Sequence, residues 1–103
     1  MDNKNNQNQM QFNLHPDVAV GVYSNLALIA HSKNDFILDF AVNLPGMPKP
    51  DVVTRVICSP ENTKRLLAAL QENIARYEQQ FGVININQRD EKIINPFGPK
   101  ELS

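Results

Sequence analysis

The sequence contains a single cysteine, no tryptophan and no apolar run that approaches the roughly 18 residues of a membrane helix. Cys58 stands alone, so an intrachain disulfide is excluded, which is typical of proteins in a reducing compartment. The polar N-terminus, MDNKNNQNQMQ, lacks the apolar core of a signal peptide. These absences predict a cytoplasmic protein with no contact to a membrane.

An excess of charge of one sign is also lacking. Ten Lys and Arg residues stand against eleven Asp and Glu residues, and both signs are spread along the chain. A protein that binds nucleic acid by neutralising phosphates normally has a basic face. The most basic stretch is Lys64 and Arg65, and Glu61, Glu72 and Glu78 balance it. We therefore expect no nucleic-acid partner.

A chain of 103 residues forms one domain at most, and its ends are too polar to belong to the core. We expect a disordered Asn- and Gln-rich leader at residues 1–13, a folded domain at residues 14–86 and a flexible tail at residues 87–103. The tail contains an apolar patch around Phe97, for which two interpretations stay open. The patch docks on a partner, or it folds back onto its own domain.

Two stretches of alternating apolar residues predict an antiparallel hairpin. The first runs from Val18 to Ala30, the second from Asp35 to Leu44, and HSKND between them supplies turn residues. The alternation predicts one inward face and one mixed outer face. The residues expected to point inward are Val18, Val20, Val22, Leu26, Leu28 and Ala30 in the first strand, and Phe36, Leu38, Phe40, Val42 and Leu44 in the second.

A third strand and one long helix complete the predicted domain. The proline-rich stretch PGMPKPD cannot continue a ladder and precedes a strand at Val52 to Cys58. Ser59 is a candidate N-cap, Pro60 opens the helix, and Gly82 ends it as a left-handed C-cap. The fold class is α+β: a three-stranded antiparallel sheet and a helix of about 33 Å that lies along it, in the order β-β-β-α.

One helix covers only one face of such a sheet, so the outer face stays partly apolar. Exposed apolar surface of this kind usually marks an interface, and we expect a homodimer. The apolar spacing Leu67, Leu70, Ile74, Tyr77 and Phe81 also permits helix pairing, but no distinct charge pattern at the flanking positions supports a coiled coil.

No group of residues predicts catalysis or a metal site. Ser24, Ser32, His15 and His31 lack a nucleophile elbow and an oxyanion loop, and Cys58 fits a buried apolar position. A metal site built from His31, Asp35 and Asp39 is conceivable, but turn and strand positions explain the two carboxylates more simply. We expect no enzyme, no catalytic residue, no metal and no cofactor.

Three segments carry a resemblance to a known family: GVYSNLALIAHSKNDFILDF, PGMPK and SPENTKRLLAALQENIARYEQQFG. Together they resemble a family of short, uncharacterised bacterial proteins that is classed as a domain of unknown function. The resemblance spans residues 15–85 and implies a small cytoplasmic protein with no assigned activity or cofactor. Members of that family are often encoded beside RNA polymerase subunits, so the resemblance also implies a transcription-associated accessory role as an alternative.

The sequence thus favours a non-enzymatic interaction or structural module that acts as a homodimer. Under the alternative, the protein binds RNA polymerase or contacts RNA weakly through Tyr23 and the edge formed by Lys64 and Arg65. The predicted interaction surface lies on the outer half of the hairpin, the start of the helix and the tail. Its candidate residues are Tyr23, Asn25, Ile29, His31, Asp39, Lys64, Arg65 and Phe97.

Overall fold

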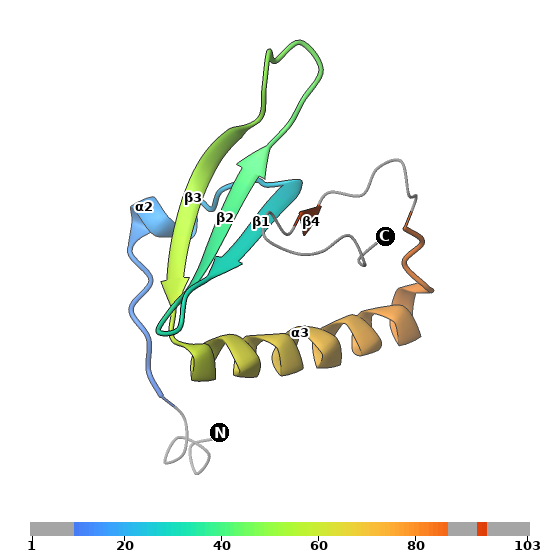
Figure 1. The fold of residues 1–103 in the computed structure, drawn as a ribbon. Coiled ribbons are helices and arrows are strands. Elements are labelled where there is room, and N and C mark those ends of the chain that lie inside the picture. The colour runs from blue at the N-terminus through green and yellow to red at the C-terminus, as the bar shows by residue number, and fades with distance from the viewer. Residues whose placement is uncertain (1–9, 87–92, 95–103) are drawn as a thin grey trace.

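The computed structural model describes residues 10–86 and 93–94 of the chain. Residues 1–9 of the predicted leader lie outside the described residues, as do residues 87–92 and 95–103 of the predicted tail, which include Phe97. The elements follow one another as shown in Figure 1: α2 (Pro16–Ala19), β1 (Leu26–His31), β2 (Phe36–Val42), β3 (Asp51–Cys58), α3 (Pro60–Phe81) and β4 (Ile93–Ile94). The sheet order is β3-β2-β1-β4, with β4 parallel to β1. The predicted three-stranded antiparallel sheet followed by a long helix is confirmed.

The hairpin turn forms where the sequence predicts it. The Ser32 amide donates to the Asp35 carbonyl at 2.9 Å, and the Ser32 hydroxyl accepts from the amides of Asn34 and Asp35 at 3.3 Å each. A serine side chain that binds the backbone two and three residues ahead holds such a turn closed. The loop therefore has four residues and pairs His31 with Phe36.

This pairing corrects the predicted phase of the first strand. Residues directly opposite in an antiparallel pair share a face of the sheet, and Ile29 pairs with Leu38 while Ala27 pairs with Phe40. The face that carries Phe36, Leu38 and Phe40 therefore also carries Ala27, Ile29 and His31. The residues expected to join it, Leu26, Leu28 and Ala30, lie on the opposite face.

The predicted start of the first strand is also wrong. Instead of an extended strand from Val18, the chain forms the short helix α2 and an irregular segment up to Asn25. Continuing the observed register would place Val22 opposite Pro45, and proline cannot donate to a ladder. Gly21, with a φ of 83°, also interrupts an extended chain. The apolar side chains of Val18, Val20 and Val22 are consequently exposed.

Side chains close the end of the hairpin beyond the ladder. The Ser24 hydroxyl donates to the Ala41 carbonyl at 2.8 Å. The Asn25 side chain donates to the Asn43 carbonyl at 3.0 Å and accepts from the Asn43 amide at 2.9 Å. These bonds replace the backbone pairing that the proline-rich turn prevents, and Ala41 beneath them is almost fully buried, with 1% exposure.

The helix α3 has the bounds that the sequence predicts. The Ser59 hydroxyl accepts from the Asn62 amide at 3.1 Å, Pro60 occupies the first turn and Glu61 adds a negative charge there. At the other end Gly82 has a φ of 100° and a ψ of 165°, so its φ is positive as expected, but its ψ differs from the expected left-handed helical value. Its amide caps the helix by donating to the Glu78 carbonyl at 2.9 Å.

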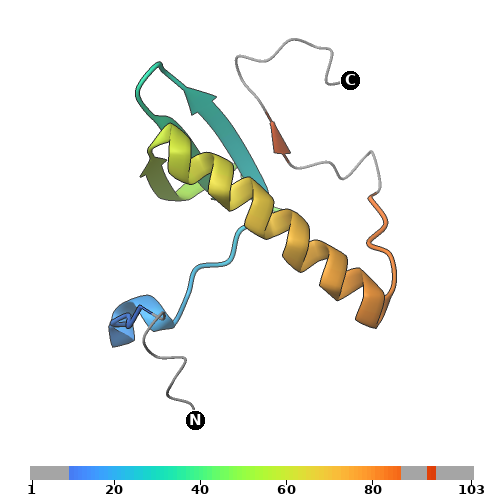
Figure 2. The same cartoon turned by 90° about the horizontal axis from the view of Figure 1, so that it is seen from below.

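The placement of α3 differs from the expected layer. Only one residue, Ser59, separates β3 from the helix, so the chain turns sharply, and α3 runs beneath the sheet instead of along its strands (Figure 1). Seen from below, its C-terminal half extends past the three antiparallel strands (Figure 2). None of the α3 residues is buried.

The buried core of the described residues is correspondingly small. It consists of four side chains, namely Leu26, Leu38, Ala41 and Cys58. The predicted apolar role of Cys58 agrees with this burial. A domain with so little buried apolar area is near the lower limit of independent stability.

The N-cap gives a direct test of how α3 begins. Replacing Ser59 with Ala removes the acceptor for the Asn62 amide and should lower the free energy of unfolding by about 1 kcal/mol, measured by urea denaturation. Ser59→Asp keeps an acceptor and should leave the midpoint nearly unchanged. Equal losses in both variants would show that the cap does not stabilise the helix.

Candidate functional site

One face of α3 is apolar and exposed, and we call it the helix stripe. Its residues lie three or four positions apart, a spacing that places them on one side of a helix. All of them are exposed, from 37% for Leu66 to 65% for Phe81. The helix stripe consists of Leu66, Leu67, Leu70, Ile74, Tyr77 and Phe81.

The N-terminal half of the helix stripe borders an open groove against the sheet, which we call the sheet groove. Its volume is about 540 Å³ and most of its lining is apolar. The sheet contributes residues of β1 and β2, and their position there confirms which face of the sheet points toward α3. The lining consists of Ile29, Phe36, Leu38, Pro60, Thr63, Lys64, Leu66, Leu67 and Leu70.

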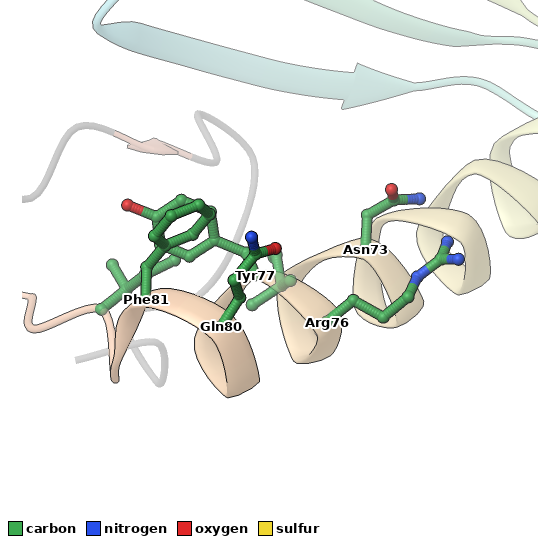
Figure 3. Close-up of a pocket in the computed structure, with 7 residues that line it drawn as sticks. Asn73, Arg76, Tyr77, Gln80 and Phe81 are labelled. Carbon is green, nitrogen blue, oxygen red and sulfur yellow. The ribbon is translucent and has the colours of Figure 1, made fainter.

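The C-terminal half of α3 forms a second, shallower hollow of about 470 Å³ together with Ile84 (Figure 3). The rings of Tyr77 and Phe81 lie beside each other, with centroids 5.0 Å apart. Asn73, Arg76 and Gln80 supply its polar rim. This half of the helix presents two adjacent aromatic rings to solvent, an arrangement common at the centre of protein interfaces.

Charged side chains of α3 form pairs along the helix. Arg65 donates to the Glu61 carboxylate, and Arg76 lies 3.9 Å from the Glu72 carboxylate, each pair one helical turn apart. Glu78 has a structural role, because its carboxylate accepts from the Ile84 amide at 2.9 Å and holds the chain after the helix. The helix thus has a charged side in addition to its apolar stripe.

An ion pair lies on the sheet face opposite α3. Asp39 and Arg55 are directly opposite residues of β2 and β3. The guanidinium donates twice to the carboxylate, from Nε to Oδ1 at 2.7 Å and from Nη2 to Oδ2 at 2.8 Å. This bidentate hydrogen bond lowers the pKa of Asp39 below its ordinary value of 3.8, and the positive charge of Arg55 acts in the same direction.

The structure does not bring the predicted site residues of the hairpin together. Ile29 and His31 face α3, where His31 lies against Phe36 with ring centroids 5.4 Å apart. Asp39 lies on the other face, against Arg55, so the expectation of one shared outer surface is wrong.

The remaining described candidates have separate contacts. Tyr23 is exposed in the segment that precedes β1, and the Asn25 side chain donates a hydrogen bond to the Asn43 carbonyl. Lys64 borders the sheet groove, and Arg65 pairs with Glu61.

The same geometry separates the residues that could bind a metal. His31 and Asp39 are on opposite faces of the sheet, and Asp39 is engaged by Arg55. Within residues 10–86 and 93–94 there is no group of three or more His, Cys, Asp or Glu side chains able to hold a metal ion. In the same residues no helix is both long and apolar enough to cross a membrane.

A family model described as "Protein of unknown function (DUF3467)" matches residues 1–86, which is most of the chain. The chain belongs to the DUF3467 family. This membership confirms the resemblance to a domain of unknown function. Neither the curated proteins nor the solved structures contain a match to this DUF3467 chain.

Sequence reasoning missed the main surface of this DUF3467 protein. Among the candidate residues that the structure describes, only Ile29 and Lys64 line the sheet groove, and none belongs to the helix stripe. The signal is the spacing of the apolar residues along α3, which fits packing on the sheet as well as helix pairing. A helix of 22 residues is about 33 Å long, whereas the strands of six to eight residues span about 20 to 27 Å.

The Asp39–Arg55 pair predicts a specific pH dependence of stability. Because the folded-state pKa of Asp39 is lower than its unfolded value, the pair stabilises the fold above pH about 4, and this contribution is lost as the pH falls through the folded pKa. Asp39→Asn should reduce stability at pH 7 and flatten the loss of stability between pH 5 and pH 2, measured by thermal unfolding.

Arg55→Met is the partner control, since it removes the guanidinium and leaves the carboxylate. It should also flatten the acid limb of the stability curve. An acid limb as steep in Asp39→Asn as in the unmodified protein would show that this pair does not govern the acid sensitivity.

Proposed function

We propose that this DUF3467 protein is a non-enzymatic cytoplasmic interaction module that works as a homodimer, with the helix stripe as its interface. The observation that carries the proposal is the exposure of every residue of the helix stripe. Six large apolar side chains lie exposed on one side of one helix, and apolar surface gathered in this way marks association sites in soluble proteins.

The small core supports the same proposal. With four buried hydrophobic residues among those described, the domain gains little from its own packing. Covering the helix stripe would add the burial that the single chain lacks. Complete burial of an exposed Leu, Ile or Phe side chain contributes about 1.5 to 3 kcal/mol, and each half-exposed residue of the helix stripe would gain a part of this.

The charges of α3 favour self-association over contact with a nucleic acid. Arg65 and Arg76 are both paired with glutamates of the same helix, so α3 offers little free positive charge to a nucleic acid. Recovery of RNA polymerase subunits in stoichiometric amounts with the tagged protein from its native host would favour the accessory role instead.

Ile74→Glu tests the proposal, because Ile74 lies at the middle of the helix stripe. The unmodified protein should sediment at tens of micromolar with twice the 11.6 kDa mass of the chain. A glutamate at this position would have to be buried in both copies and should weaken the dimer by on the order of a hundredfold or more.

Gln79→Glu is the matched control, since it adds the same charge to the same helix outside the helix stripe and both hollows. It should sediment as the unmodified protein does, and far-UV circular dichroism should show equal helix content in both variants. A monomer mass for the unmodified protein at tens of micromolar would refute the proposal.

A further inference from the structure

The polar residues beside the helix stripe bear on how two copies of α3 would pair. This inference rests on the proposed homodimer. Written as heptads, α3 has Leu67, Ile74 and Phe81 at position a, and Thr63, Leu70 and Tyr77 at position d. The e positions beside this seam are then Lys64, Gln71 and Glu78. The order of these three residues, positive, neutral and negative, is what sets the direction of pairing.

In an antiparallel pair of helices each a residue meets a d residue of the other helix, and e residues meet e residues. Aligning α3 with a second α3 in this way produces the layers Leu67–Tyr77, Leu70–Ile74 and Thr63–Phe81, each occurring twice by the two-fold symmetry. The aromatic ring of Phe81 meets the smallest side chain of the seam, Thr63. The same alignment sets Lys64 opposite Glu78 at both ends and Gln71 opposite its own copy at the centre.

A parallel pair lacks this complementarity. There the e residues face g residues, which places Glu78 near Asn73 and Lys64 near Ser59, and no opposite charges meet. The charges at the e positions therefore meet opposite charges only when the two helices are antiparallel.

The two hollows of the surface match in the same alignment. Thr63, Leu67 and Leu70 line the sheet groove, and their opposite residues in the layers are Phe81, Tyr77 and Ile74, which line the hollow at the C-terminal half of α3. The adjacent rings of Tyr77 and Phe81 thus meet the apolar groove bordered by Ile29, Phe36 and Leu38. Each copy supplies one groove and one aromatic pair.

We propose that α3 pairs antiparallel with α3 of a second copy, that the Tyr77–Phe81 pair of each copy fills the sheet groove of the other, and that Lys64 and Glu78 form an ion pair across the interface at both ends. The occupant of the groove is then a second copy of this chain. Lys64 and Glu78 of one chain lie about 21 Å apart along the helix, so they cannot pair within it.

Charge reversal tests this register. Lys64→Glu should replace two attractive contacts by two repulsive ones and weaken the dimer about tenfold, measured by sedimentation equilibrium. The double variant Lys64→Glu with Glu78→Lys should recover most of that loss, because the opposite charges face each other again. Thermal unfolding of Glu78→Lys alone controls for the lost contact to the Ile84 amide.

Cross-linking gives a second readout that does not depend on affinity. Gln71→Cys lies opposite its own copy near the two-fold axis and should form a disulfide-linked dimer under mild oxidation. Gln79→Cys should not, and the unmodified chain, whose Cys58 is buried, sets the background.

The outcomes separate the register from the proposed homodimer. A dimer that shows neither charge rescue nor a Gln71→Cys cross-link would overturn the antiparallel pairing and leave the homodimer standing. A monomer at tens of micromolar would overturn both. Rescue together with the central cross-link supports the antiparallel pair.

Discussion

The structure depends on how one helix is joined to the sheet. Only Ser59 lies between β3 and α3, so the helix turns beneath the sheet instead of running along its strands, and its C-terminal half passes beyond the three antiparallel strands. The apolar stripe therefore stays in water, and the sheet keeps an open groove in front of Ile29 and Leu38. The small core and the paired hollows both follow from this constraint.

The local signals of α3 were enough to predict its bounds. Ser59, Pro60 and Gly82 act within one turn of the chain, so their effect does not depend on the rest of the fold. The phase of β1 depended instead on the length of the loop. With four loop residues His31 pairs with Phe36, which moves Ile29 to the side of Leu38, and an alternation pattern cannot specify this by itself when both faces of a strand are partly apolar.

The candidate site was predicted less well, for the same reason. Once the phase of β1 was wrong, Ile29, His31 and Asp39 were assigned to one outer face, although cross-strand pairing separates them. The prediction that helix α3 covers the sheet also removed its apolar residues from the list of surface candidates.

Folding and assembly are coupled in the proposed dimer. A chain that buries four hydrophobic side chains in its described part has a small stability of its own, and covering the helix stripe in both copies adds burial that exists only in the dimer. The ion pairs of Lys64 and Glu78 contribute little energy compared with this burial, because they are exposed to solvent. Their effect is on direction: the apolar layers favour association, and the charges select the antiparallel alignment in which each aromatic pair faces a groove.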